Sequence, residues 1–262
     1  MASCCECRRE PKRGWKSSDY EDRRPLGMAM EYRIDFHTHT GHSADSLLPA
    51  ARLLEAAARR GLAAVAVTDH NSLGGALQAQ ALAARDPDRF GHLIVLPGEE
   101  VKTAEGELIG LFLHEPVPRG LSPEETIALI RRQGGLVLVP HPFDRFRGSR
   151  LRAAALDRIA GLIDAIEVFN ARTTLAADNA RARAFAEQHG LAMVAGSDAH
   201  VAQEVGNGYV TLRAPPAASP QALLAQLREG YPGGRMSAPL VHAGSTLARW
   251  RKRLGLAPAV QL

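Results

Sequence analysis

The sequence has little cysteine, few aromatic residues and no long apolar run. Its three cysteines, Cys4, Cys5 and Cys7, lie together at the start, so the rest of the chain has no thiol for a disulfide or a cysteine-rich zinc site. Phe, Trp and Tyr make up 5% of the 262 residues, which argues against base stacking as the main activity. No apolar run reaches the roughly 18 residues of a membrane span, and no signal peptide is recognisable. We therefore expect a cytoplasmic protein with no membrane partner.

The formal net charge of +4 is unevenly distributed along the chain. Residues 1–29 have a net charge of +2 and residues 248–262 of +4, which leaves −2 for residues 30–247. The basic residues near the C-terminus, Arg249, Arg251, Lys252 and Arg253, are more typical of a solvated helix face than of a phosphate-backbone site. We therefore expect no stable binding of duplex nucleic acid.

Short apolar runs alternate with helical patterns from Tyr32 almost to the end of the chain. We expect strands at 33–37, 63–68, 93–96, 108–113, 136–139, 165–169, 192–195 and 209–212, and helices at 49–60, 73–84, 122–133, 151–159, 175–189 and 220–228. The strand at 108–113 is expected to form a hairpin with the strand before it. This order predicts an α/β fold, a small closed or distorted barrel of mostly parallel strands over residues 30–244. Residues 1–29 lack hydrophobic periodicity and are expected to be a disordered tail, and residues 245–262 a basic helix and tail.

Histidine and acidic residues follow the predicted strands, at the points where the strands end. Because the C-terminal ends of barrel strands meet at one mouth, six strand ends bring at least five imidazoles and three carboxylates into one cleft. Carboxylates packed together repel one another, and burial adds a desolvation cost, whereas divalent cations remove both penalties. Mixed nitrogen and oxygen ligands without thiolate favour Mn, Fe or Zn.

The order of these motifs resembles the PHP (polymerase and histidinol phosphatase) family. The matching motifs are His37-Thr-His39 with Asp45, Thr68-Asp-His70-Asn, Gly98-Glu-Glu100, His141-Pro and Gly196-Ser-Asp198-Ala-His200. They span about residues 32–242 in the order that the family has. The resemblance implies a distorted (βα)7 TIM-like barrel, with two or three divalent metal ions at the C-terminal ends of the strands, and it implies cleavage of phosphoesters.

The resemblance also implies which residues hold the metals. The first metal is expected at His37, His39, Glu100 and Asp198, the second at Glu100 and His141, and the third at Asp45, His70 and His200. On the strand after the bridging glutamate many relatives have a further histidine, where this chain has Glu107. Either Glu107 replaces that imidazole, which would favour Mn or Fe over Zn, or the second metal binds more weakly. Glu99 remains a rival of Glu100, and His42 of Asp45.

Other polar residues of these motifs are expected to support the ligands or to contact the substrate. Asp35 and Asp69 are expected to orient imidazoles through their second ring nitrogen, or simply to cap turns. Arg172 is the first candidate for a bidentate clamp on a phosphoryl oxygen, ahead of Arg145 and Arg147. Asn170 is a candidate contact to the second metal or to the substrate.

The expected reaction is hydrolysis of a phosphomonoester, or of a small phosphodiester or nucleotide, with Glu100, Asp198 and His200 in catalytic roles. A water activated by the metals would attack phosphorus in line, because no Ser or Cys stands in a recognisable nucleophile elbow. The expected partner is a small phosphorylated substrate, with a nucleotide or an oligonucleotide end as the other option.

Two alternatives remain open on the sequence alone. An amidohydrolase also begins with His-x-His on a barrel strand, but it would normally hold its second metal on a lysine or two later histidines, and Lys102 is the only lysine in the barrel body. A metal-bound barrel that regulates without catalysing would be recognised by loss of ligands, and here nearly the whole set is retained.

Overall fold

Nine strands pair into a single sheet in the computed structural model, which describes residues 30–238 and 241–256. The strands are β1 (Tyr32–Thr38), β2 (Leu62–Val67), β3 (Ile94–Thr103), β4 (Gly106–Leu111), β5 (Leu136–Val139), β6 (Ala165–Asn170), β7 (Ala192–Gly196), β8 (Gly208–Leu212) and β9 (Tyr231–Gly234). Their order in the sheet is β7-β6-β5-β4-β3-β2-β1-β8-β9. The pairs β1–β2, β2–β3, β5–β6 and β6–β7 are parallel, whereas β4 and β8 run antiparallel to their neighbours.

The sheet curls so that its two halves meet near the ends of β1 and β7. The amide of His39 donates to the carbonyl of Ala199 at 2.9 Å, and the amide of Asp198 donates to the carbonyl of His37 at 2.7 Å. An isolated parallel bridge between Thr38 and Ala199 continues this seam. The result is the distorted, nearly closed α/β barrel that the sequence predicts. The two segments that meet at this seam, the end of β1 and the residues after β7, both carry predicted ligands.

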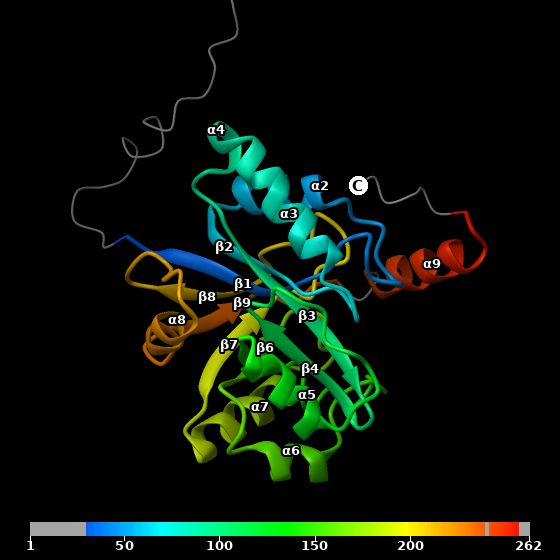
Figure 1. Cartoon of the computed structure of the whole chain (residues 1–262). Helices are drawn as coiled ribbons and strands as arrows, with labels where there is room; N and C mark the ends of the chain where they lie inside the picture. Colours follow the sequence, from blue (N-terminus) through cyan, green and yellow to red (C-terminus); the bar gives the residue numbers. More distant parts are fainter. Residues whose placement is uncertain (1–29, 239–240, 257–262) are drawn as a thin grey trace, which may run out of the picture. The chain divides into compact units, whose positions relative to one another are not determined.

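The helices of the same unit cover the sheet. They are α2 (Ala50–Arg59), α3 (Gly74–Arg85), α4 (Pro87–Phe90), α5 (Pro123–Arg132), α6 (Ala153–Ile159), α7 (Ala176–His189), α8 (Pro220–Leu227) and α9 (Val241–Arg253). Figure 1 shows α2 and α3 on one side of the sheet and α5, α6 and α7 on the other. Helix α5 starts as expected, because the hydroxyl of Ser122 accepts from the amide of Glu125 while the Glu125 side chain accepts from the amide of Ser122.

Alternate strand residues face two different apolar cores. On β5, Leu136 and Leu138 belong to a core that includes Leu223 and Leu227 of α8. Their neighbours Val137 and Val139 pack instead in the core beneath helices α2, α3, α5, α6 and α7. Each fully buried side chain of this size stabilises the fold by about 1.5–3 kcal/mol. The strands are therefore fixed on both faces, and their C-terminal ends are held in place.

The structure differs from the expected elements mainly at segments with weak propensity. Strand β3 continues to Thr103, well beyond the expected end at residue 96, and pairs with β4 in the expected hairpin. Helix α4 and strand β9 were not expected; β9 reads Tyr-Pro-Gly-Gly, a composition that only an edge strand tolerates. The C-terminal helix begins at Val241, before the expected residue 245. The tail predicted at 1–29 lies outside the described residues.

No helix in the described part of the chain is both long enough and apolar enough to cross a lipid bilayer.

Candidate metal centre

The structure brings the nine predicted metal ligands into one cluster at the end of the barrel where the parallel strands have their C-termini and the antiparallel β4 begins. They lie on or directly after β1 (His37, His39, Asp45), β2 (His70), β3 and β4 (Glu100, Glu107), β5 (His141) and β7 (Asp198, His200). Eight of these residues are buried, and the His70 side chain is 21% exposed. Side chains from six strands therefore meet where the sequence motifs placed them.

The four residues predicted for the first metal have the spacing of ligands that share one ion. The Nε2 atoms of His37 and His39 lie 3.0 Å apart, and His39 Nε2 lies 3.4 Å from Glu100 Oε2 and 3.3 Å from Asp198 Oδ1. Two ligands at about 2.1 Å from a tetrahedral metal are about 3.4 Å apart. This donor set can therefore hold a divalent cation without rearrangement.

Glu100 lies between two groups of imidazoles. Its Oε2 is 2.9 Å from His70 Nδ1 and 3.3 Å from His37 Nε2, while its Oε1 is 3.0 Å from His141 Nε2. Although burial raises it, the pKa of Glu100 is held well below its usual range by the neighbouring His70 and His37. The carboxylate thus faces both sides of the cluster as an anion, the geometry that a bridging ligand needs.

The residues predicted for the third metal also lie together. Asp45 Oδ1 is 3.2 Å from His200 Nε2, and Asp45 Oδ2 is 3.5 Å from His70 Nε2. The rings of His39 and His200 are 4.3 Å apart between centroids, so this group is continuous with the first.

Glu107 lies on the other side of Glu100. Its Oε2 is 3.9 Å from His141 Nε2, and it forms a group with His70 and Glu100 whose ligand atoms lie within 4.8 Å of one another. Burial, together with the negative charge of Glu100, raises the pKa of Glu107. The structure thus places a second carboxylate beside Glu100 and His141.

Unpaired buried oxygens indicate that the cluster is built for cations. Oxygens of Asp45, Glu107 and Asp198 are buried and receive no hydrogen bond from any described residue. A buried carboxylate oxygen without a donor is costly unless a cation coordinates it. The donor set therefore fits divalent metal ions bound by nitrogen and oxygen.

Two of the predicted ligands have a strained backbone. His141 has a φ of 30° and Asp198 a φ of 54°, a region that residues with a Cβ rarely adopt. Such strain persists only where surrounding contacts impose it. The fold thus forces both side chains to leave their strand ends toward the cluster.

Asp35 and Asp69 were expected either to orient imidazoles or to cap turns, and neither carboxylate contacts an imidazole in the structure. Asp35 accepts hydrogen bonds from the amides of His37, Ser197 and Gly206, so it caps the turn that follows β7. Asp69 accepts from Thr40 and from the Ser43 hydroxyl at 2.7 Å. That same hydroxyl lies 2.9 Å from His39 Nδ1, so Asp69 acts on His39 only through Ser43.

Glu167, which was not predicted from the sequence as a site residue, is the carboxylate that orients His37 and His141. Its Oε1 lies 3.2 Å from His37 Nδ1, and its Oε2 accepts from the amide of His141 at 2.8 Å. Asn170 Nδ2 donates to the same Oε2 at 2.9 Å and to Asp198 Oδ2 at 3.2 Å. The signal was available, because Glu167 lies on β6 within an otherwise apolar strand, where a buried carboxylate requires a partner.

The rivals for the ligand positions lie elsewhere. Glu99 Oε2 accepts from the amide of Val117 at 2.9 Å, away from the imidazoles. His42 belongs to none of the ligand groups formed by the described residues. Lys102, the lysine that an amidohydrolase reading would need, has an exposed side chain.

The candidate phosphate-binding arginines have different surroundings. Arg147 Nη1 lies 2.6 Å from Asp198 Oδ2, at the cluster. Arg145 is held instead by Asp178 of α7, with Nη2 2.7 Å from Oδ1, and its side chain is 50% exposed. The structure therefore supports Arg147 as a group at the site and draws Arg145 away from it.

Arg172 was the first candidate for a phosphate clamp, but its guanidinium is already engaged. It is buried, with Nη1 2.6 Å from His200 Nδ1 and Nε 3.2 Å from Glu204 Oε1. Its Nη2 donates to the Ser245 hydroxyl at 2.8 Å and to the carbonyl of Val241 at 3.1 Å. Because both Nη atoms are used by these partners and Nε faces Glu204 without a hydrogen bond, Arg172 positions His200 and contacts α9.

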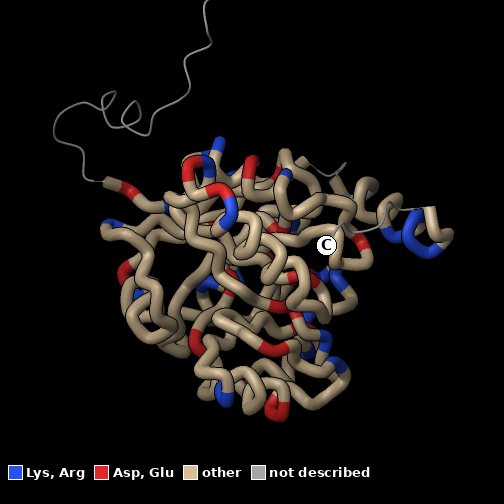
Figure 2. Tube along the Cα trace, turned by 45° about the horizontal axis from the view of Figure 1, so that its top comes forward, with Lys and Arg blue, Asp and Glu red and all other residues tan. Residues whose placement is uncertain are grey.

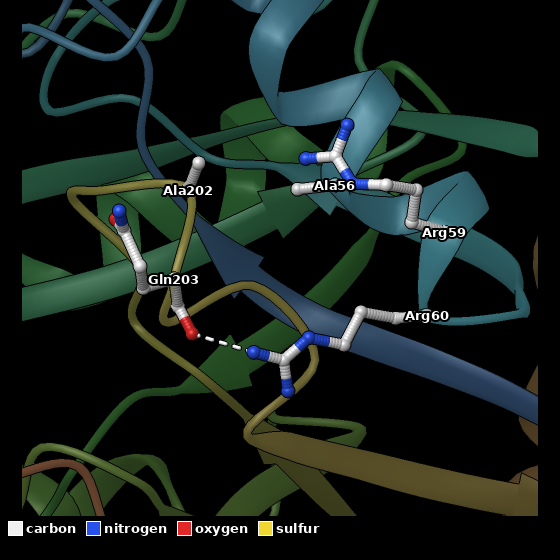
Figure 3. Close-up of a pocket in the computed structure, with 5 residues that line it drawn as sticks. All are labelled: Ala56, Arg59, Arg60, Ala202 and Gln203. Atoms are coloured by element: carbon white, nitrogen blue, oxygen red, sulfur yellow. Dashed lines mark hydrogen bonds between the residues drawn. The ribbon is translucent and has the colours of Figure 1, made fainter.

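Two surface hollows lie away from this cluster. One, of about 230 Å³, is lined by Ala56, Arg59, Arg60, Ala202 and Gln203, and Arg60 donates there to the carbonyl of Gln203 at 2.7 Å (Figure 3). The other, of about 320 Å³, is lined by Arg33, Arg60, Leu62, Gly206, Tyr209, Gly234 and Arg235. Neither hollow includes a predicted ligand.

Comparison with known proteins points to the PHP family. The PHP-associated family matches residues 176–232. Two proteins of Methanocaldococcus jannaschii, both named only as uncharacterized, are similar in sequence. MJ1587 is 41% identical over 150 residues, which are 53% of this chain and 82% of that protein. MJ0417 is 35% identical over 181 residues, which are 68% of this chain and 69% of that protein.

Solved structures share the fold. A two-domain protein from Bacteroides vulgatus that contains a predicted PHP-like metal-dependent phosphoesterase has a TM-score of 0.63 at 17% identity, covering 79% of this chain and 66% of that one. An amidohydrolase from Chromobacterium violaceum, with bound sulfate and no metal, has a TM-score of 0.53 at 21% identity. The match covers 74% of this chain and 96% of the amidohydrolase. At these identities the likeness concerns the fold alone.

Proposed function

The chain belongs to the PHP family, and from this premise we propose that it is a hydrolase that cleaves a phosphomonoester with two or three divalent ions of Mn, Fe or Zn. The observation that carries the proposal is the spacing of His37, His39, Glu100 and Asp198, whose facing atoms lie 3.0–3.8 Å apart. This spacing suits one shared cation, and Glu100 extends the set toward His141.

The protein residues divide into ligands and groups that hold the ligands. His37, His39, Glu100 and Asp198 would hold a first ion, Glu100, Glu107 and His141 a second, and Asp45, His70 and His200 a third. Glu167 fixes His37 and the backbone of His141, and Ser43 fixes His39. When bound, the ions would activate a water near neutral pH and neutralise phosphoryl oxygens.

Arg147 is the proposed contact to the phosphoryl group from the loop after β5. Its guanidinium already lies against Asp198, so a phosphoryl oxygen near that carboxylate would be within reach of the same fork. Asn170 donates to the same oxygen of Asp198 that Arg147 contacts and keeps the carboxylate oriented. His200 Nδ1 lies against Arg172, and Nε2 faces Asp45. In a site that holds two ions, with no third ion on Nε2, this nitrogen is the proposed group for transferring a proton to the leaving oxygen.

A panel of phosphomonoesters, phosphodiesters and nucleotides, assayed for phosphate release with Mn, Zn or Fe, tests this function. We expect Glu100→Gln and Asp198→Asn each to lower the rate by at least about a hundredfold, because each removes a charge from the first metal. Glu99→Gln is the matched control: it changes the adjacent carboxylate on the same strand and should keep the wild-type rate.

The proposal fails if Glu100→Gln retains wild-type turnover or if no metal activates the protein. Amide substrates should be assayed in parallel, because an amidohydrolase shares the fold. Hydrolysis of amides without phosphate release would favour that class. Stoichiometric metal without turnover on any substrate would favour a regulatory barrel.

A further inference from the structure

Helix α9 is docked against the metal centre, although its basic composition predicted a solvated face. Ser245 and Ala248 are buried. Arg172 donates to the first turn of α9, and the Lys252 ammonium donates to the carbonyls of Gly41 and Ser43. In Figure 1 α9 lies beside the loop that follows β1, and Figure 2 shows its basic residues in blue along the same helix.

Arg249 is the residue of α9 that reaches a predicted metal ligand. Its Nη2 donates to Asp45 Oδ2 at 2.9 Å, and the other oxygen of that carboxylate is 3.2 Å from His200 Nε2. The Arg249 side chain is 52% exposed, so it lies at the edge of the cluster and touches solvent. Arg249 therefore contacts the cluster from a position that is open to solvent.

Comparison with the other arginines favours Arg249. Arg172 is buried, its two Nη atoms bind protein groups and its Nε faces Glu204, and Arg145 is held by Asp178. Among the described residues, only Arg147 and Arg249 place a guanidinium against a carboxylate predicted to bind metal. The Nε and Nη1 atoms of Arg249 have no hydrogen-bond partner in the described part of the chain, so this guanidinium keeps donors for a further acceptor.

We propose that Arg249, delivered by α9, binds the phosphoryl group of the substrate at the side of the cluster formed by Asp45, His70 and His200. This inference rests on the proposed function. A cation that shares Asp45 would weaken the hold of that carboxylate on the guanidinium, whose fork would then donate to a phosphoryl oxygen. Arg147 approaches from the Asp198 side, so the cluster carries arginines from two distant parts of the chain.

Binding of inorganic phosphate to the full-length protein loaded with Mn²⁺, measured by titration calorimetry, tests the role of Arg249 without any turnover. We expect Arg249→Gln to weaken phosphate binding by about tenfold to a hundredfold, the loss typical of one charge-assisted hydrogen bond. Arg249→Lys, which keeps the charge and loses the fork, should lie between. Arg253→Gln, on the same helix and exposed, should stay within about twofold of wild type.

Steady-state kinetics and metal titration supply the second readout. If the wild type hydrolyses a phosphomonoester, Arg249→Gln should raise KM by a similar factor and leave Mn²⁺ affinity equal or higher. Unchanged phosphate affinity in Arg249→Gln would overturn the proposal. If that variant bound Mn²⁺ more tightly while its phosphate affinity stayed the same, Arg249 would be only a counter-ion for Asp45. Absence of turnover in the wild type would refute the proposed function, while the phosphate titration would still decide on Arg249.

Discussion

Glu99 and Glu100 are consecutive carboxylates on β3 with opposite surroundings. Glu100 faces four imidazoles, whereas Glu99 points to the other face of the strand and receives a hydrogen bond from the Val117 amide. Burial raises the pKa of Glu99 to about 7, although the Val117 amide opposes the shift. One strand therefore presents a carboxylate to the metals and buries its neighbour without a cation.

The raised pKa of Glu99 should make the free energy of unfolding depend on pH. Its pKa is higher in the folded protein than in the unfolded chain, so the folded state binds the extra proton between about pH 4.5 and 7. Stability is therefore lost as pH rises through this range, by on the order of 3 kcal/mol. We expect Glu99→Gln to match the wild type near pH 4.5 and to exceed it above pH 7.

Urea unfolding of the metal-free protein at a series of pH values measures this difference. Glu187→Gln, which changes an exposed glutamate of α7, is the control and should follow the wild-type curve. A Glu99→Gln curve parallel to wild type at every pH would contradict the account.

At the scale of elements, hydrophobic patterning predicted most strands and the helices between them. It failed for β9, whose Pro and Gly residues have low strand propensity, and for the end of β3, where Glu99, Glu100 and Lys102 break the apolar run. The nine ligands could be predicted because their motifs occur in the order of the PHP family, on or near the ends of strands. The roles of Arg172 and Arg249 could not, because they depend on where α9 docks, and its basic surface residues carry no signal for that.

Strands β7 and β8 approach each other closely at Gly196 and Gly208. A Cβ at Gly208 would lie 2.1 Å from the carbonyl oxygen of Gly196, which belongs to the backbone just before Asp198. Because the backbone cannot yield cheaply, Gly208→Ala should destabilise the protein by more than about 3 kcal/mol and weaken metal binding.

Gly233→Ala is the matched control on the neighbouring strand. A Cβ at Gly233 meets nothing within 4 Å, so this change should cost less than about 1 kcal/mol. Chemical denaturation of both variants gives the comparison, and equal losses would show that packing between β7 and β8 does not set the cost.

At the scale of the whole molecule, the metal centre joins nearly all of the barrel. Its ligands come from strands on both halves of the sheet, so ions bound there would tie those halves together. An ion at a hundred times its dissociation constant stabilises the folded state by about 2.7 kcal/mol. For a domain of this size that corresponds to a rise of about 5–10 °C in melting temperature.

Thermal unfolding with Mn²⁺ or Zn²⁺ and with EDTA measures this effect. We expect the metals to raise the melting temperature, EDTA to reverse the rise, and Asp198→Asn to lose most of it. A melting temperature that no metal changes would contradict the metal centre itself.

The seam between β1 and the segment after β7 also bears on the order of folding. The hydrogen bonds between His37 and Asp198 and between His39 and Ala199 join parts of the chain that are far apart in sequence. Closing so long a loop costs conformational entropy, and contacts of this kind form late. During synthesis the first two histidines leave the ribosome long before their acidic partner. The complete first site, with Asp198 in place, would therefore form only once this seam has closed.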